Sequence, residues 1–586
     1  MLHSTLAKRV CLLLLLLIAF YFYGLGHFPF VGPDEPRYSQ VAREMLQSRD
    51  LITPTLGGHT WFEKPVLLYW LIALSFSLFG VTEAAARFAP ALSGVLTVLA
   101  VFWLGRRIER ASIGSQSIAC TSALMLVSMP GIIVFARGAS FDILVTMTLT
   151  WALVMFLAAQ LEHDETKRRK LYASFYCFIG LSLLAKGLVG IVIPFGVVSL
   201  FYLMRWSLPA RDFFVSLLWG LPLAIAVSAI WYGPVLALHG WPFVNEFFLQ
   251  HHFARYVSNK YHHPQPVYYY LLIIFPMALP WLVLAIAALW RIRRSTFRGN
   301  SIPDVVLVFA LAWFLAPLIL FSFSGSKLPG YLLPVLPALA LLAATRLKMS
   351  EGAESLTATP GTRASSPASM RIAAPPGARA SPPASMGIAA PPGTRASSPA
   401  SMRIVGAFLI AIAAAGVVYA RSSGTLSVTC AVFIVLPLLI AGILAASTPR
   451  RIQGVTFSVA AAVPLSFFLA LHCDIPQLIE ERSARPLLER AAMQGFAEAP
   501  LYFLHEVDRG TEFYAAGRIP YDQNGQPIKF EGAYQVLDEA QRLQKTVLVI
   551  VPVIHVFQLE NLERAAVERI TDNGELAIVA VRPKDY

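Results

Sequence analysis

Apolar runs of about 20 residues recur along the whole sequence, and they constrain the fold more than any other feature. A helix needs about 20 apolar residues to cross the hydrocarbon core of a bilayer. Candidate spans begin near residues 10, 88, 117, 143, 171, 188, 214, 267, 303, 330, 404, 425 and 455. Hydrophobic residues make up 56% of the chain and charged residues only 14%, against about a quarter charged in soluble proteins. We predict a polytopic α-helical membrane protein with about 13 transmembrane helices.

The Lys and Arg residues that give the net charge of +13 are distributed along the chain as membrane topology predicts. Lys and Arg gather in short loops between the runs, as at 106–110, 167–170, 205–211, 291–298 and 450–451. Because such loops stay in the cytoplasm, we expect the N-terminus inside and, after an odd number of spans, the C-terminus outside. Lys8 and Arg9 precede a long apolar run without a small-residue cleavage site, which indicates an uncleaved first helix. No basic face typical of nucleic-acid binding is evident.

The five cysteines do not form a recognisable pattern. They are Cys11, Cys120, Cys177, Cys430 and Cys473. The first four lie inside apolar runs, and no CxxC occurs. We therefore expect neither a zinc knuckle nor a disulfide framework.

Composition divides the chain into two domains. Residues 1–473 form the predicted transmembrane domain, in which 31–87 is a first outer loop with juxtamembrane helices. Residues 350–403 are rich in Pro, Ala and Ser and hold a repeat over 360–403, so we expect a disordered cytoplasmic loop. Residues 474–586 mix a helix-like stretch at 479–494 with strand-like runs at 501–504, 546–551 and 576–581. They predict a periplasmic α/β domain.

The polar residues outside the basic loops fall on the predicted outer side. Ionisable residues near a membrane are costly and usually line a cavity or a pathway, although any single one of them also fits an interfacial ion pair. Five outer segments carry them: Asp34, Glu35, Arg37, Arg43, Glu44, His59, Glu63 and Lys64; Arg137 and Asp142; Lys186; Glu246, His251, His252, Arg255, His262 and His263; Lys327 and Tyr331.

This mixture of charges indicates phosphate chemistry. The cations are sufficient to hold a phosphate or a pyrophosphate, and the carboxylates can act as a base or bind a hard cation. A histidine of the pair His251 and His252 can complete a metal site with Glu63. The absence of HExxH and of a P-loop argues against a zincin and against an ATP-driven pump.

Several motifs resemble a known family. PDEPRYSQVAREMLQSRDLITPTLGGHTWFEKPVLLYWLIALSFSLFG and EAAARFAPALSGVL, followed in order by RGASFDILVTM, LAKGLVG, QHHFARY and SGSKLPGYLLPVLPALALL, resemble the lipid A 4-amino-4-deoxy-L-arabinose transferase family. That family belongs to the GT-C glycosyltransferases and is related to the protein O-mannosyltransferases. The resemblance covers nearly the whole chain except the repeat and a divergent tail, and the tail leaves the acceptor open.

The resemblance implies roles for particular residues. Asp34 and Asp142 would be catalytic carboxylates, and the donor phosphate would meet Arg37, Lys64, Lys327 and Tyr331. Arg137 and Lys186 would be substrate-site cations. Glu63 and His252 would hold a divalent metal ion, which would be Zn, Mg or Mn.

The expected function is transfer of a sugar, a pentose or a hexose, from a polyprenyl (undecaprenyl) phosphate donor to a periplasm-facing acceptor. The resemblance implies lipid A or lipopolysaccharide as the acceptor, inversion at the sugar, a monomer and the bacterial inner membrane. A protein or another glycan is the alternative acceptor. A transporter or flippase of lipid-linked sugar is the alternative of another class, but the sequence has no internal duplication and its polar residues cluster on one face.

Overall fold

The computed structural model describes Leu15 and residues 18–111, 118–254, 265–290, 292–357, 398–449, 452–515, 517–523 and 525–584. Most of the predicted repeat loop, residues 358–397, lies outside this part of the chain. The predicted bounds of that loop are wrong at both ends, because 350–357 and 398–403 are helical. Glu, Ala and Leu in 350–357 favour continuation of the preceding helix, and Pro399 is tolerated in the first turn of the next one.

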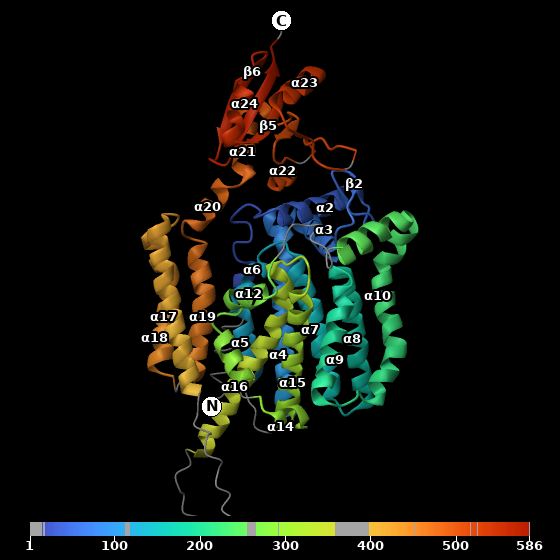
Figure 1. Cartoon of the computed structure of the whole chain (residues 1–586), viewed down its shortest axis with the longest axis vertical. Helices are drawn as coiled ribbons and strands as arrows, with labels where there is room; N and C mark the ends of the chain where they lie inside the picture. The colour runs from blue at the N-terminus through green and yellow to red at the C-terminus, as the bar shows by residue number, and fades with distance from the viewer. Residues whose placement is uncertain are drawn as a thin grey trace, which may run out of the picture.

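A bundle of long helices forms the larger part of the molecule (Figure 1). Its helices are α4 (Glu83–Ala111), α5 (Ile118–Val127), α6 (Pro130–Ala136), α7 (Phe141–Gln160), α8 (Glu165–Lys186), α9 (Val189–Arg205), α10 (Arg211–Phe243), α12 (Tyr269–Ala278), α13 (Leu282–Leu289), α14 (Arg294–Arg298), α15 (Ile302–Ser322), α16 (Leu336–Thr357), α17 (Ser398–Ser423), α18 (Val428–Ser447) and α19 (Ile452–Ala470). A π-helix η1 (Val244–Ala254) and a 3-10 helix η2 (Pro329–Val335) complete it.

The bundle is a multi-pass membrane domain. Among the described residues, 7 helices are long and apolar enough to cross a bilayer, or 8 if the bent pair α5 and α6 forms one span. Further apolar helices of 10–17 residues accompany them. Helices suit this environment because they satisfy every backbone group internally where no water is present. The predicted helical membrane fold is confirmed, while the number of about 13 spans stays a prediction.

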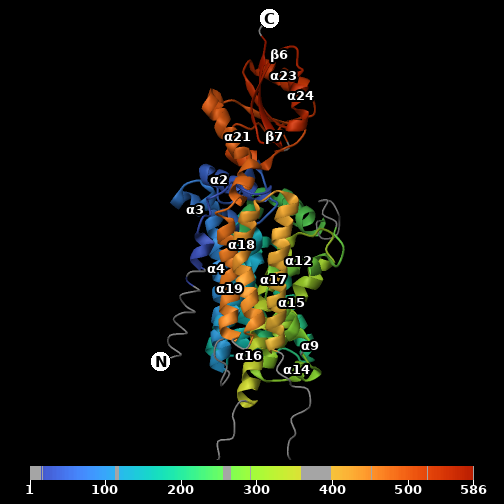
Figure 2. The same cartoon turned by 90° about the vertical axis from the view of Figure 1, so that its left-hand side faces the viewer.

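The first predicted outer loop forms a layer across one end of the bundle. It contains α2 (Asp34–Ser48), strands β1 (Thr55–Leu56) and β2 (His59–Thr60), and α3 (Leu67–Phe79). The β1–β2 turn is made by Gly57 and Gly58, whose φ angles of 63° and 80° favour glycine. This layer lies between the bundle and the C-terminal domain, as Figures 1 and 2 show.

The C-terminal domain is built on a five-stranded mixed sheet of order β4-β3-β5-β7-β6. Strands β4 (Lys529–Phe530), β3 (Leu501–Leu504) and β5 (Val547–Pro552) are parallel, and β7 (Leu576–Pro583) runs antiparallel to β5 and to β6 (Ala565–Asp572). The helices of the tail are α20 (Ile475–Glu481), α21 (Ala484–Ala491), η3 (Ala492–Phe496), α22 (Arg509–Tyr514), α23 (Ala533–Leu543), η4 (Val553–His555) and α24 (Val556–Glu560). The three predicted strands are confirmed as β3, β5 and β7.

The C-terminal domain is docked on the first-loop layer through α22, which packs on α2. Arg43 donates from Nη2 to the Phe513 carbonyl at 2.8 Å and covers the Phe513 ring at 4.4 Å. The Tyr514 hydroxyl accepts from the Phe30 amide and donates to Glu83. Gly57 lies so close to the Tyr521 ring that a side chain there would overlap it. The docked face therefore joins segments more than 400 residues apart in sequence.

A disulfide bond joins Cys430 to Cys473, which corrects the expectation from the sequence. Cys430 stands in the first turn of α18, and Cys473 follows α19. These helix ends are adjacent in space, because the Asp474 carboxylate accepts from the Ser427 amide at 2.8 Å. Sequence spacing alone could not reveal this pairing, since the two residues are 43 positions apart and belong to different segments of the chain. Cys177 is a free thiol.

Candidate functional site

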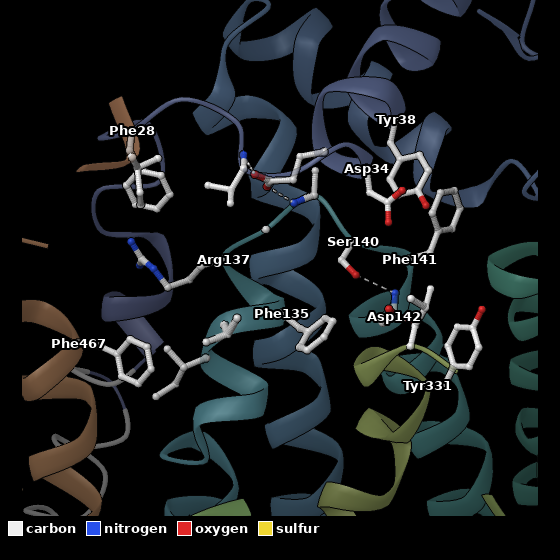
Figure 3. Close-up of a pocket in the computed structure, with 18 of the residues that line it drawn as sticks. Phe28, Asp34, Tyr38, Phe135, Arg137, Ser140, Phe141, Asp142, Tyr331 and Phe467 are labelled. Carbon is white, nitrogen blue, oxygen red and sulfur yellow. Dashed lines mark hydrogen bonds between the residues drawn. The ribbon is translucent and has the colours of Figure 1, made fainter. Parts of the chain in front are cut away.

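A cavity of about 510 Å³ lies beneath the first-loop layer, at the end of the bundle that faces the sheet domain. Seven of the residues predicted for the site line it: Asp34, Glu63, Lys64, Arg137, Asp142, Lys186 and Tyr331. They come from α2, the loop before α3, the α6–α7 turn, α7, α8 and η2. Figure 3 shows Asp34, Ser140, Asp142 and Tyr331 gathered on one side of the cavity.

One group of charges belongs to α2 and the loop that follows it. Arg37 donates to Asp34 at 2.8 Å and to Glu63 at 3.2 Å. Glu63 also accepts from Lys64 at 2.8 Å. Asp34 keeps 54% of its side chain exposed, whereas Glu63 keeps only 12%. Asp34 is therefore the carboxylate of this group that a substrate can reach most readily.

Arg37 is held in its charged form by this arrangement. Burial works to lower its pKa, but Glu63 and other nearby acidic groups outweigh burial and raise the pKa above its usual value. Arg37 also lies 5.6 Å from the Trp61 ring centroid, a cation–π distance. It does not line the cavity itself, and it contacts the cavity through Asp34 and Glu63.

A second group of charges comes from the bundle. Lys186, the last residue of α8, pairs with Asp142 in the first turn of α7. The Lys186 ammonium also lies 4.4 Å from the centroid of the Tyr331 ring. Asp142 is placed by the helix start, because the Ser140 hydroxyl accepts from the Asp142 amide as the N-cap of α7. This group faces the cavity from below the first-loop layer.

Glu35 has a structural partner that the sequence analysis missed. Its carboxylate accepts two hydrogen bonds from Arg87 of α4, at 3.0 and 2.8 Å. It also accepts from the amides of Val31 and Ala139. Arg87 is fully buried, and it further donates to the carbonyls of Leu25, Phe28 and Pro29. The signal in the sequence was an arginine in the second turn of an apolar helix, which is rarely without a function.

Tyr38 is a second residue that the sequence analysis missed. It lines the cavity beside Asp34, and its ring packs edge-on against Phe141 at 4.8 Å. Burial, together with the Asp34 and Glu63 carboxylates, raises the pKa of Tyr38 well above its ordinary value. Its hydroxyl is therefore a protonated hydrogen-bond donor at neutral pH.

Lys327 does not line the cavity. It is buried and donates to the carbonyls of Ser324 at 2.6 Å and Gln265 at 3.0 Å. In this position it holds the segment before η2, which carries Tyr331.

The side chains available as metal ligands do not support the predicted metal site. The His252 side chain lies outside the described residues, and Glu63 meets the cations Arg37 and Lys64. Among the residues that the structure describes, no three His, Cys, Asp or Glu side chains are grouped to hold a metal ion. We therefore derive no step through a metal, and the Glu63–His252 pair stays a prediction.

The remaining wall of the cavity is apolar. Phe135 comes from α6, Phe467 and Leu471 come from the end of α19, and Ile475 and Ile479 from α20. In Figure 3, Phe467 and Phe28 stand on the side opposite Asp34 and Asp142. The cavity is therefore amphipathic, with paired charges on one side and a hydrocarbon-like surface on the other.

Comparison with known proteins identifies relatives of this chain. Residues 6–244 match the family model of the dolichyl-phosphate-mannose-protein mannosyltransferases. Undecaprenyl phosphate-alpha-4-amino-4-deoxy-L-arabinose arabinosyl transferase of Yersinia enterocolitica is 33% identical over 321 residues, 53% of this chain and 54% of that protein. The second such transferase of Pseudomonas fluorescens is 33% identical over 361 residues, 59% and 62% of the two chains. The chain thus spans about half to three fifths of the length of these curated relatives.

Solved structures share the whole architecture. The crystal structure of ArnT from Cupriavidus metallidurans bound to undecaprenyl phosphate has a TM-score of 0.73, and its apo form has 0.75. Each is 22% identical in sequence and covers 98% of both chains. The GT-C fold predicted from the sequence is confirmed, including the small C-terminal sheet domain.

Proposed function

We propose that this chain is a glycosyltransferase of the ArnT type, which transfers a sugar from a polyprenyl phosphate to an acceptor at the sheet-domain end of the bundle. The observation that carries the proposal is the cavity, in which Asp34, Lys64 and Lys186 stand opposite an apolar wall. A lipid phosphosugar combines the same two properties, a charged head and a hydrocarbon tail. The relatives' names support undecaprenyl phosphate as the carrier. The proposed acceptor is lipid A in the bacterial inner membrane, as the resemblance of the sequence motifs implies.

The proposed reaction is a single displacement at the sugar carbon C1. An acceptor oxygen attacks C1, the bond from C1 to the phosphate oxygen breaks, and the polyprenyl phosphate leaves with the electron pair. Negative charge on the leaving phosphate increases as that bond breaks. Lys64 and Lys186 face the cavity and would stabilise this charge, which is often the largest catalytic effect.

Asp34 is the proposed catalytic carboxylate. Its exposed oxygen can accept the proton of an acceptor hydroxyl, and general base catalysis of this kind contributes about 10²–10⁴-fold. If the acceptor is a phosphate that is already ionised, Asp34 orients the acceptor instead. Arg37 donates to Asp34 and fixes its position, and Tyr38 supplies a donor beside it.

The disulfide supports an outward orientation of this end of the molecule. Disulfides persist in the periplasm and are rare in the cytoplasm. Cys473 lies between Leu471 and Ile475, which both line the cavity. We therefore propose that the cavity and the sheet domain face the periplasm, with the basic loops inside.

The family model of the protein mannosyltransferases favours a second candidate, in which the acceptor is a protein hydroxyl. Both candidates share the donor chemistry and differ only in the acceptor.

A reconstituted assay tests the proposal. Purified protein in lipid vesicles would receive a synthetic polyprenyl phosphosugar with lipid A, with a hydroxyl-rich peptide, or with no acceptor. We expect release of free polyprenyl phosphate that depends on one acceptor. We expect Asp34→Asn and Lys64→Met to reduce it at least 100-fold. Movement of the intact phosphosugar across the bilayer without cleavage would contradict transfer and support a flippase.

A further inference from the structure

Of the residues around the cavity that the structure describes, every carboxylate is paired with a cation, and one cation remains without a carboxylate. Each carboxylate forms an ion pair with a cation, in the pairs Asp34 with Arg37, Glu63 with Lys64, Glu35 with Arg87 and Asp142 with Lys186. Arg137 also lines the cavity, and among the described residues no carboxylate pairs with it. Its positive charge is therefore the excess charge of the site.

Arg137 is buried with part of its hydrogen-bonding capacity unused. Arg137 is only 8% exposed to solvent. Nη1 donates to the Phe20 carbonyl at 2.8 Å, and the guanidinium lies 5.1 Å from the Phe20 ring centroid. Nη2 is buried and has no hydrogen-bond partner in the described part of the chain.

This state is energetically unfavourable without a ligand. Burial lowers the pKa of Arg137 to about 10, assisted by the positive charge of Arg87, so the guanidinium is still charged at neutral pH. A buried charge without an ionic partner is costly. Proteins retain such groups where an anion completes them, and arginine suits phosphate through its planar set of donors.

The position of Arg137 separates it from the other cations. It follows α6, and its side chain points toward Phe28 and away from Asp34 and Asp142 (Figure 3). Lys186 is instead paired with Asp142 on the opposite side. Arg137 therefore stands at the apolar side of the cavity, where the headgroup of a lipid would enter next to its tail.

We propose that Arg137 forms a second anion subsite of the cavity, which takes the phosphate of a lipid-borne substrate. This inference rests on the proposed function and deepens it. Two lipids carry the required group: the polyprenyl phosphate carrier and a phosphorylated acceptor such as lipid A. The chemistry of recognition is the same for both, so the experiment must distinguish them.

The test measures lipid binding to the full chain in nanodiscs by native mass spectrometry. The probes are undecaprenyl phosphate against undecaprenol, and lipid A with its phosphates against dephosphorylated lipid A. The variants are Arg137→Met, which keeps apolar volume without charge, and Arg137→Lys, which keeps the charge. Arg106→Met is the matched control, because Arg106 is an exposed cation at the far end of α4. The thermal midpoint of each ligand-free protein is recorded as well.

We expect Arg137→Met to bind one phosphorylated lipid at least tenfold more weakly, with the dephosphorylated counterpart unchanged. We expect Arg137→Lys to restore part of that affinity and Arg106→Met to change nothing. The ligand-free midpoint of Arg137→Met should be unchanged or higher, because an uncompensated buried charge has been removed. The lipid affected identifies the subsite as one for the carrier or one for the acceptor.

Two results would overturn the subsite. Wild-type affinity of Arg137→Met for both phosphorylated lipids would mean that no phosphate meets this residue. A lowered midpoint or failure to fold would make the guanidinium a structural group. If the wild type itself bound neither phosphorylated lipid better than its dephosphorylated form, the proposed function would fail as well.

Discussion

At the scale of single residues, ion pairs between different elements hold the site together. Glu35 and Arg87 are the most completely satisfied of these pairs, and they connect the start of α2, α4 and the turn before α7. Asp34 and Asp142 lie at two of these connected places. The pair therefore fixes the spacing of the two carboxylates.

We predict that Glu35→Ala destabilises the protein strongly, because it leaves Arg87 buried without its carboxylate. The loss of one partner of a buried pair typically costs about 3–5 kcal/mol. Thermal unfolding in detergent measures it as a lowered midpoint. Asp34→Ala is the control, since a half-exposed carboxylate contributes little to stability. Equal midpoints for the two variants would show that the Glu35–Arg87 pair is not a structural anchor.

Gly330 allows a close approach between η2 and α7. A side chain added at this position would overlap the Asp142 carboxylate. We predict that Gly330→Ala displaces Asp142 from Lys186 and lowers the rate of transfer at least tenfold. Gly233→Ala is the control, because a side chain on that glycine of α10 would meet nothing within 4 Å. Unchanged turnover of Gly330→Ala would argue that the Asp142–Lys186 pair has no catalytic importance.

Much of the site was predictable because the polar residues all fall in segments on the same predicted side of the membrane. Asp34, Lys64, Asp142 and Lys186 lie in different outer segments, and the cavity brings them together. The partner of Glu35 was not predictable, because 52 residues separate it from Arg87. The absence of a carboxylate partner for Arg137 among the described residues was not predictable for the same reason. It depends on which cation each carboxylate contacts in the folded protein.

At the scale of elements, α2 connects the cavity to the sheet domain. Its first residue is Asp34, and Arg43 on the same helix contacts α22. Helix α22 therefore packs directly on the helix that carries the proposed catalytic carboxylate.

We predict that Arg43→Ala loosens this contact, lowering both the thermal midpoint and the transfer rate. The Phe513 carbonyl loses its donor and the Phe513 ring loses its cation, which together cost about 1–3 kcal/mol. Arg542→Ala on α23 is the control, because its side chain is 68% exposed and its acidic partner Glu539 lies three residues earlier on the same helix. A fall in activity for both variants alike would mean that docking of α22 is unimportant.

The disulfide permits a test of orientation. In a chain with Cys11, Cys120 and Cys177 replaced by Ser, we predict that a membrane-impermeant thiol reagent labels intact spheroplasts only after reduction. Cys430 and Cys473 would then be outside and oxidised. Labelling without a reductant would contradict the bond, and labelling only after permeabilisation would place the cavity on the cytoplasmic side.

Elements with strong patterns were predictable and short ones were not. The runs that became β3, β5 and β7 are continuous apolar strands, whose burial from both faces is visible in the sequence. Strand β6 was missed because its sequence, Ala565–Asp572, is neither a continuous apolar run nor a regular alternation, and its burial is uneven. Strand β4 has two residues and no pattern of its own.

At the scale of the whole molecule, the cavity is enclosed between two bodies of different character. The bundle supplies Asp142, Lys186 and the apolar wall, and the first-loop layer supplies Asp34 and Lys64. The sheet domain covers that layer on the side away from the bundle (Figures 1 and 2). A lipid donor from the membrane and an acceptor from the same leaflet would therefore meet at one interface.

The most direct test of the account is glycolipid mass spectrometry on cells that contain the wild-type protein, Asp34→Asn or no protein. We predict a sugar mass increment on lipid A only with the wild type. We also predict accumulation of an unused polyprenyl phosphosugar in the other two strains. An increment of the same size with Asp34→Asn would contradict the central claim that this carboxylate carries out sugar transfer in the cavity.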